Sequence, residues 1–451
     1  MKFLALLYAL ILAVPLCMML RASPAFTRLF WVVVGALPFL APGLPVFDIG
    51  LVSWADTWVG YVYGLEVTVL DIAMLAAFFA FRGSPLPLWL KLPALVFGLA
   101  LALSMGQADE PMAAFFGVWQ YARMVLLMIV VAHACRADQD VAPRILLGMV
   151  VGIGVQLAVS LEQRLFLGFT QARGLFVHQN TLGMIAHMVL VPHLAMLLHR
   201  GTSHSSTFRN LVGVGAAASV AILTASRGTI GMAAAGMALT YGALALSHLT
   251  LRKIAFAGSA ALVLVVAGPL AYSTLENRFH AAPLREDVYD ERAAFAASAK
   301  AIVADHPFGV GTNHYVHIAR DEGYSYRAGV ARGSRESLVH NAFWLTAAEA
   351  GWFGMAAFIA MLATPLVTAL VVGWRVRGTF GGHLIFGLGL SLVPVYLQSL
   401  YEWVIYAREV QYVLFTTMGM TFGLALAAQA HLRKTAAAAP HEAPGAARVP
   451  A

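Results

Sequence analysis

The chain has 451 residues, of which 60% are hydrophobic and only 11% are charged, and its formal net charge at pH 7 is +7. This composition excludes an ordinary soluble protein, because soluble domains carry roughly 25% charged residues. It also argues against a nucleic-acid-binding protein, since the basic residues are spread over short segments between apolar runs and form no single stripe.

Apolar runs recur from Met1 to Gln429. Most are close to the length of about 20 residues that a helix needs to cross a bilayer. The expected spans are residues 2–20, 27–42, 59–81, 88–105, 112–134, 142–162, 180–198, 209–225, 228–248, 253–272, 341–372, 383–400 and 405–429. The first run ends without a small-residue cleavage site and is interpreted as a retained helix. The sequence thus predicts an all-α polytopic membrane protein.

Lys and Arg residues in the short connections predict the orientation. By the positive-inside rule, the cytoplasmic connections are those with Arg82 and Lys91, Arg136 and Arg144, Arg200 and Arg209, Arg252 and Lys253, and Arg375 and Arg377. The segments 106–111, 163–179, 225–228, 273–339 and 401–407 then lie outside. Thirteen full spans would place the N-terminus outside, so the short run 27–42 is expected to cross halfway or to lie on the surface. About twelve transmembrane helices remain, with both termini cytoplasmic.

The chain divides into four parts on this basis. Residues 1–272 form N-terminal transmembrane helices, 273–339 a large and partly helical extracytoplasmic loop, 340–429 the last three spans, and 430–451 a disordered cytoplasmic tail. The loop holds 17 of the 51 charged residues. Titratable groups concentrate at functional sites, so we expect the chemistry in this loop and at its edges.

Six ionisable residues lie at or near membrane depth, namely Glu66, Asp71, Arg123, His187, His193 and Glu349. Such groups are costly in lipid and usually face the protein interior or a wet cavity. Internal pairs that lock helices together are the preferred interpretation. No internal repeat and no matching pair of broken helices is visible, which argues against an inverted-repeat transporter.

A loop helix is predicted over residues 288–303, where apolar residues recur at helical spacing and would pack against the membrane body. Arg292 falls on this apolar face, and Arg285 lies in line with it. An inward-facing guanidinium needs an anion, and its planar fork suits phosphate oxygens. Both arginines are candidate phosphate ligands. Pairing with Glu286, Asp290 or another loop acid is the alternative.

A second candidate is Arg227, in a tight Ser-Arg-Gly break between two apolar runs on the outer side. An Arg in such a turn is also typical of an interface anchor whose charged head reaches the lipid headgroups. The preceding external segment contributes further polar residues on the same side, namely Arg164, Arg173, His178 and Asn180. Together these residues are hypothesised to line a cationic pocket at headgroup level.

The third candidate is His340, at the expected start of a long span. The positive end of a helix disfavours added positive charge, so this position favours a neutral imidazole, which can act as a general base. Gly351, three helical turns later, would lie on nearly the same face, and Gly351 and Gly354 would let another helix or a lipid chain approach. A capping histidine beside a packing glycine pair is the alternative.

No metal site is expected from the sequence. The acids between 286 and 291 would scatter over different helix faces, whereas a hard cation needs converging oxygen atoms. Cys17 and Cys135 lie at the edges of different spans and predict neither a disulfide nor a thiolate site. The glycines in 309–313 are interpreted as a turn, since no strand precedes them.

Four parts of the chain carry a resemblance: 174–183 with Asn180, the Ser226-Arg227-Gly228 turn, Arg292 with the following 305–311, and His340-Asn341 with Gly351 and Gly354. Together they resemble the bacterial O-antigen ligase and polymerase superfamily. The last part agrees with the ligase pattern of His, then Asn, Ser or Gln, nine residues, Gly, two residues and Gly, Thr or Tyr. The other parts are shared with polymerases and with protein-directed oligosaccharide transferases.

The resemblance implies a glycosyltransferase that needs neither metal nor cofactor, in the inner membrane of a Gram-negative bacterium. It would move a polysaccharide from undecaprenyl pyrophosphate to a sugar of lipid A-core on the periplasmic face, which completes lipopolysaccharide. His340 corresponds to the catalytic histidine of the family, and Arg227 and Arg292 to its essential arginines. Substrate-binding roles resting more on position than on motif fall on Arg285, Arg173, Arg164, His178, Asn180, Asn341, Gly351 and Gly354.

Three alternatives remain open. An O-antigen polymerase uses the same donor but another lipid-linked glycan as the acceptor. A protein O-oligosaccharyltransferase transfers the glycan to a protein. A transporter of lipid-linked glycans should show alternating access and little need for a loop histidine. The His340 pattern favours the ligase.

Overall fold

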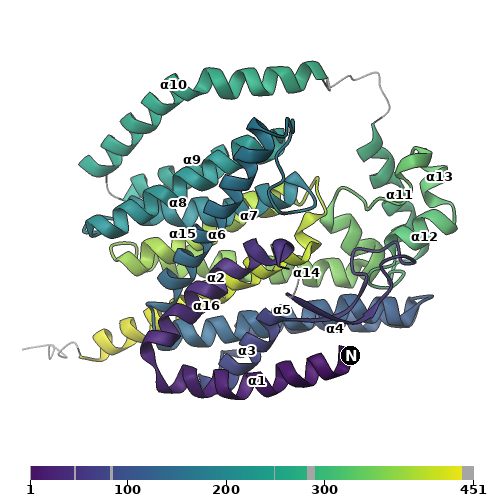
Figure 1. Cartoon of the computed structure of the whole chain (residues 1–451), viewed down its shortest axis with the longest axis horizontal. Coiled ribbons are helices and arrows are strands. Elements are labelled where there is room, and N and C mark those ends of the chain that lie inside the picture. Colours follow the sequence, from purple (N-terminus) through teal and green to yellow (C-terminus); the bar gives the residue numbers. More distant parts are fainter. Residues whose placement is uncertain (1, 45–46, 82–84, 248, 282–289, 439–451) are drawn as a thin grey trace, which may run out of the picture.

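Long helices make up most of the computed structural model, which describes residues 2–44, 47–81, 85–247, 249–281 and 290–438. Within this part of the chain, eleven helices are long and apolar enough to cross a membrane (Figure 1). They are α1 (Lys2–Ala22), α2 (Pro24–Leu40), α4 (Leu88–Ser104), α5 (Pro111–Ala137), α6 (Val141–Leu165), α7 (Gln179–Leu197), α8 (His204–Leu223), α9 (Arg227–Ser247), α14 (Ala342–Arg375), α15 (Phe380–Gln398) and α16 (Arg408–Ala438). The prediction of an all-α polytopic membrane protein is confirmed.

The run 27–42 differs from its prediction. We expected it to cross halfway or to lie on the surface, but it belongs to α2 and the short 3-10 turn η1 (Ala41–Gly43), which together form a candidate span of 20 residues. Pro38 lies within this helix near its end and does not divide it. The reason is packing, because the buried face of α2 lies along α6 over much of its length.

The run 59–81, expected to be one span, is divided in two. Its first part pairs as strand β2 (Gly64–Thr68) with the antiparallel strand β1 (Asp48–Ser53). Its second part is the 12-residue helix α3 (Val69–Ala80). The division occurs at Thr68, whose side chain accepts a hydrogen bond from the Asp71 N–H while Asp71 accepts one from the Thr68 N–H. This capping box starts a new helix in the middle of the apolar run.

Two helices continue past the expected boundaries. α10 (Leu251–Ala281) covers the expected span 253–272 and runs nine residues further. α16 ends at Ala438, so the first residues of the expected disordered tail are helical. The rest of that tail lies outside the described residues.

α7 is the central helix of the molecule. All of its residues from Asn180 to Leu197 are buried, and it packs against α8, α9 and α15. Its two histidines have partners inside the protein: His187 Nε2 lies 3.0 Å from Gln398 Oε1, and His193 Nδ1 lies 2.7 Å from the Val189 carbonyl oxygen. The first turn of α7 therefore has a fixed position at one end of the helical body.

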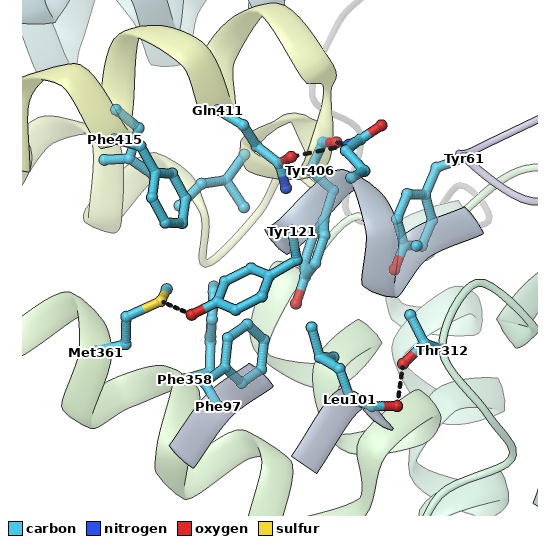
Figure 2. Close-up of a pocket in the computed structure, with 14 residues that line it drawn as sticks. Tyr61, Phe97, Leu101, Tyr121, Thr312, Phe358, Met361, Tyr406, Gln411 and Phe415 are labelled. Atoms are coloured by element: carbon cyan, nitrogen blue, oxygen red, sulfur yellow. Dashed lines mark hydrogen bonds between the residues drawn. The ribbon is translucent and has the colours of Figure 1, made fainter. Parts of the chain in front are cut away.

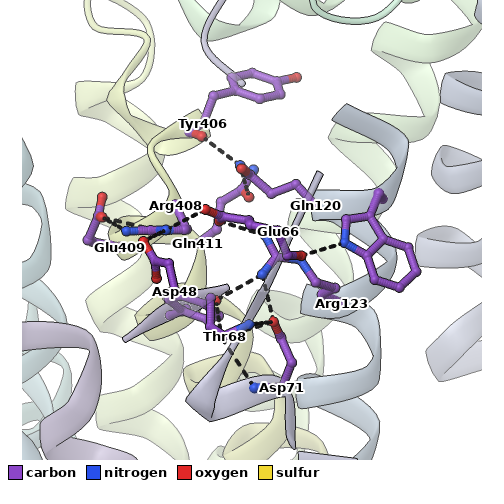
Figure 3. A network of polar contacts seen from close by, with 12 residues as sticks. Asp48, Glu66, Thr68, Asp71, Gln120, Arg123, Tyr406, Arg408, Glu409 and Gln411 are labelled. Carbon is purple, nitrogen blue, oxygen red and sulfur yellow. Dashed lines mark hydrogen bonds and ion pairs between the residues drawn. The ribbon is translucent and has the colours of Figure 1, made fainter. Parts of the chain in front are cut away.

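A network of charged side chains ties the hairpin to the helices (Figure 3). Arg123 of α5 lies 3.0 Å from Glu66 and 2.7 Å from Asp71. Arg408 at the start of α16 lies 2.7 Å from Asp48 and 2.8 Å from Glu66. These pairs confirm that the ionisable groups of this region lock helices together, as expected for charges that would be costly in lipid.

The loop before the last three spans contains three helices, α11 (Glu291–Asp305), α12 (Tyr315–Asp321) and α13 (Tyr324–Arg327), and the 3-10 turn η3 (Arg332–Ser334). The three helices lie together at the right end of the molecule in Figure 1, whereas α16 ends at the left. α11 buries Phe295, Ala299, Ile302 and Val303, which confirms the predicted amphipathic helix. It begins three residues later than expected, because Asp290 caps it by accepting from the Arg292 and Ala293 N–H groups.

Candidate functional site

A polar cavity of about 170 Å³ lies where four segments of the chain meet. These segments are the first turns of α7, α9 and α11 and the connection between α15 and α16. Its lining residues are Gln171, Gln179, Asn180, Ala225, Ser226, Arg227, Gly228, Arg292, Gln398, Tyr401 and Glu402. Three residues predicted from the sequence, Asn180, Arg227 and Arg292, thus come together around one cavity.

Three helices begin at this cavity. Asn180 is the second residue of α7, Arg227 the first of α9, and Arg292 the second of α11. The N-terminus of a helix presents unsatisfied N–H groups and the positive end of the helix dipole. Three such ends with two guanidinium groups favour a bound anion, for which phosphate oxygens are suited.

Arg292 extends from the first turn of α11 toward the connection between α15 and α16. Its Nη2 donates to Oε1 of Glu402 at a distance of 2.9 Å, while 56% of its side chain is exposed. A guanidinium has five N–H donors, so the others remain available to a ligand. The expected alternative partners were acids of its own loop; the acid that pairs with it comes from the segment 401–407. Arg285, the other candidate phosphate ligand of this loop, lies outside the described residues.

Arg227 starts α9 directly after a sharp turn. α8 ends at Leu223, and Ala225 takes a left-handed conformation (φ 47°) that reverses the chain. The Tyr401 ring closes over this turn, because a Cβ atom added to Gly228 would lie 3.0 Å from it. The turn and the α15–α16 connection therefore pack directly against each other and form two walls of the cavity.

His340 lies beside the cavity, not in its lining. Its Nδ1 is 3.3 Å from Oε2 of Glu402, its ring packs edge-on against Phe295 at 5.6 Å, and 28% of its side chain is exposed. The following residue, Asn341, is the N-cap of α14 and accepts from the Phe343 and Trp344 N–H groups. His340 therefore precedes the helix, and the same Glu402 links it to Arg292.

The prediction that His340 and Gly351 share one helix face is wrong. His340 lies before the N-cap, and α14 is interrupted at Gly351, which has φ 69° and ψ −174°. Next to the interruption, the carbonyl groups of Ala348 and Glu349 accept from the N–H groups of Val310 and Gly311 in the loop, each at 2.9 Å.

Gly351 is therefore approached by the backbone of the loop, where another helix or a lipid chain was expected. A Cβ atom at this position would lie 2.5 Å from the Pro307 carbonyl oxygen. The segment 309–313 forms the expected turn, with positive φ at Gly309, Gly311 and Asn313. Glu349 fixes the end of this turn by accepting from the Tyr315 N–H at 3.1 Å.

Replacing Gly351 by Ala should destabilise the protein by about 1–3 kcal/mol or more, because its φ and ψ are accessible almost only to glycine and the Cβ would collide with the loop backbone. A thermal unfolding midpoint in detergent measures this. Gly215→Ala is the control, since a Cβ there meets nothing within 4 Å in the middle of α8. Equal midpoints for both variants would contradict the role of the kink.

Gly354, the second glycine of the pair, is helical and buried, and it lies close to Ala100 of α4.

Two of the predicted basic residues, Arg164 and Arg173, bond to the segment between α6 and α7 and are absent from the cavity lining. Arg164 donates to the carbonyl groups of Phe169 and Thr170 at 3.0 and 2.8 Å. Arg173 lies over the Phe169 ring and donates to the Val177 carbonyl at 3.3 Å. Of the residues predicted to line a cationic pocket with Arg227, only Asn180 joins it in the cavity lining, and Arg292 supplies the second guanidinium. Arg164 and Arg173 stabilise the neighbouring segment.

His178 and Asn180 form the entry to α7. His178 is the N-cap, and its Nδ1 accepts from the Asn180 N–H at 3.1 Å. Burial lowers the pKa of His178, a nearby Glu402 opposes this, and His340 lowers it further. The neutral ring can therefore keep its capping bond while lying within the electrostatic reach of the site.

Two buried polar atoms at the cavity have no hydrogen-bond partner among the described residues: Asn180 Oδ1 and the Tyr401 hydroxyl. Burial and the neighbouring Glu402 raise the pKa of Tyr401, which Arg292 partly opposes. The phenol accordingly stays protonated and can donate. Buried polar groups normally have partners, so an unpartnered acceptor and donor in a polar cavity point to a ligand or water.

A second cavity, of about 20 Å³, lies between α4, α5, α14 and α16 (Figure 2). Its lining is mostly aromatic and aliphatic, and the Tyr121 hydroxyl among it already donates to the Ala94 carbonyl at 2.6 Å. The volume suffices for about one water molecule. We interpret it as a packing gap and not as a substrate site.

Within the described ranges, no group of three or more His, Cys, Asp and Glu side chains is arranged to hold a metal ion.

Glu402, which contacts both Arg292 and His340, was not predicted from the sequence. One signal pointed to it, because the segment 401–407 is predicted to lie on the same side of the membrane as Arg227, Arg292 and His340. A lone carboxylate in a short apolar connection needs a cation nearby, and those three residues supply the candidates. Nothing local to Glu402 indicates which of them it contacts, because its partners lie 110 and 62 residues away.

Comparison with known proteins gives one family. Residues 212–359 match the family model described as O-antigen ligase. This segment runs from α8 into α14 and contains Arg227, Arg292 and His340, whereas Asn180 and Glu402 lie outside it. A search of curated proteins found no match.

Proposed function

We propose that this chain, which belongs to the O-antigen ligase family over residues 212–359, transfers O-antigen polysaccharide from undecaprenyl pyrophosphate to lipid A-core. The family supports glycan transfer of the ligase or polymerase type. The ligase reaction, its location on the periplasmic face of a Gram-negative inner membrane, and the inverting mechanism are our proposals.

The observation that carries the proposal is the shared cavity of Arg227 and Arg292. They come from different helices and meet three helix N-termini in one polar cavity of about 170 Å³. The reaction expels a pyrophosphate whose negative charge increases in the transition state. Fixed positive charge at that point lowers the barrier, and no reorganisation of the protein is needed.

His340 is the proposed general base. It would take the proton of an acceptor sugar hydroxyl while the hydroxyl oxygen attacks the anomeric carbon. The new C–O bond forms as the bond from the anomeric carbon to the pyrophosphate oxygen breaks, and the electron pair leaves with undecaprenyl pyrophosphate. A single displacement without a covalent enzyme intermediate inverts the anomeric configuration. The pyrophosphate linkage is already activated, so no nucleotide cofactor is needed.

Reconstitution tests the proposal. The purified protein is placed in liposomes with an undecaprenyl-pyrophosphate-linked glycan and purified lipid A-core, and the product is followed by gel mobility. We expect a slower band that requires both substrates. Longer lipid-linked glycan without lipid A-core would indicate a polymerase, glycan on an added pilin-like protein would indicate a protein transferase, and translocation without a new covalent bond would indicate a transporter.

Transfer should be unaffected by EDTA and should not increase with added Mg²⁺ or Mn²⁺, because the arginines supply the charge that a metal ion supplies in other phosphoryl sites. Initial rates are measured after dialysis against chelator. Loss of activity that Mg²⁺ restores would contradict the proposed metal independence. A parallel assay with a magnesium-dependent glycosyltransferase shows that the chelator is effective.

A further inference from the structure

Glu402 lies between two residues of the proposed machinery. Its side chain is only 4% exposed, and its two oxygens have different partners. Oε1 accepts from Nη2 of Arg292 at 2.9 Å, and Oε2 lies 3.3 Å from Nδ1 of His340. A buried carboxylate is stable only when it is paired and hydrogen-bonded, and here both of its contacts are candidate functional groups.

The connection that carries Glu402 is bonded to the start of α14. The Ala342 N–H donates to the Ser399 carbonyl at 2.9 Å, and the Asn341 side chain donates to the Leu400 carbonyl at 2.6 Å. After Glu402 the chain enters the 3-10 turn η4 (Val404–Tyr406). These bonds join the start of α14 to the end of α15, so Glu402 and His340 keep a fixed relative position.

We propose that Glu402 is the positioning residue of this site, which orients His340 and balances the charge that His340 gains; this inference rests on the proposed transferase function. With Nδ1–H donating to Oε2, the lone pair of the imidazole is on Nε2, the nitrogen that would face the acceptor hydroxyl. When Nε2 takes the proton, the imidazolium lies against a carboxylate. Glu402 thus stabilises the charge on the base in the step that forms the glycosidic bond.

Glu402 also positions Arg292. One N–H of the guanidinium is bound to Oε1, which directs the remaining donors from the exposed side of Arg292 toward the cavity that both residues line. The carboxylate therefore couples the group that receives the proton to the group that stabilises the leaving pyrophosphate. A bond that only closed the α15–α16 connection would not require both oxygens to contact these two side chains.

The test compares Glu402→Gln and Glu402→Ala in the reconstituted assay. Glutamine has an amide NH₂ in place of one oxygen and carries no charge, so it cannot both accept from Arg292 and stabilise an imidazolium. We expect kcat to fall by roughly 100-fold or more, with the KM for the lipid-linked donor changed by less than about threefold, because ground-state binding is retained. The control is Glu336→Gln, a change at an exposed acid in the loop before α14, which should retain wild-type kcat.

Small carboxylates separate positioning from a merely structural role. Formate added to Glu402→Ala can occupy the vacated space and contact His340 and Arg292, so we expect it to restore kcat at least about tenfold. Formate should not restore His340→Ala, which lacks the base itself. A misfolded variant would not respond to formate, and equal thermal midpoints for wild type and Glu402→Gln provide an independent check of folding.

Each outcome decides the inference. Wild-type kcat in Glu402→Gln would overturn it, and so would a loss of activity in Glu402→Ala that formate leaves unchanged. An active wild type with inactive, formate-responsive Glu402→Ala supports it. A wild type that joins no glycan to any acceptor would instead overturn the proposed function, and the inference with it.

Discussion

Replacing His340 by Ala should reduce glycan transfer by about 1,000-fold, the contribution expected of a general base. Both His340 and Arg292 contact Glu402, but only a neutral imidazole can accept a proton, because a guanidinium stays protonated. Without it, the acceptor hydroxyl must lose its proton to water during the attack. Initial rates of lipid A-core modification in liposomes measure the effect.

Alanine also removes the contact of the ring with Phe295, so a second variant keeps the volume. His340→Gln retains a polar side chain of similar length but has no basic nitrogen, and it should be as inactive as His340→Ala. The control is His306→Ala, a partly exposed histidine of the same loop, for which we expect wild-type rates. Normal transfer by a folded His340→Gln protein would remove the general base from the mechanism.

Arg292→Ala and Arg227→Ala should each reduce kcat by roughly 100- to 1,000-fold, because each removes fixed positive charge from the place where the leaving group gains negative charge. Lysine should restore only part of this loss. Arg292 contacts Glu402 with one N–H while its other donors remain for the ligand, whereas a single ammonium is a point charge that cannot reproduce this fork.

The measurement is kcat and KM for the lipid-linked donor in Ala and Lys variants of both positions. Arg320→Lys is the matched control, since Arg320 pairs with Asp321 at 2.6 Å on the surface of the same loop, and exposed pairs contribute little. Full activity in Arg292→Lys would favour simple charge pairing with Glu402 and would contradict bidentate phosphate binding.

The loop helix α11 shows what the spacing of apolar residues can predict and what it cannot. The spacing of Phe295, Ala299 and Ile302 placed these residues on one face, and all three are buried in α11. The face of a helix is a local property, so the sequence indicates it directly. The partner of Arg292 on that helix was not predictable, because Glu402 is 110 residues away.

The relation of His340 to Gly351 shows the opposite case. A regular helix through both residues was the simplest expectation, but Asn341 caps α14 after His340 and the backbone leaves the helical conformation at Gly351. Next to that kink, the N–H groups of residues 310 and 311 donate to the carbonyl groups of Ala348 and Glu349. A sequence pattern counts residues along one helix and contains no information about a distant segment that fills a break.

Local sequence features were enough to predict a polytopic membrane protein and three of the residues that line the cavity, Asn180, Arg227 and Arg292. Hydropathy over windows of about 20 residues decides which segments enter a bilayer, and the positions of Lys and Arg predicted that Arg227, Arg292 and His340 share one side. Three features became evident only in the folded protein: α7 is central, the run 59–81 divides at Thr68, and Glu402 joins His340 to Arg292. These features depend on contacts between distant segments, whose energies arise only when the helices pack.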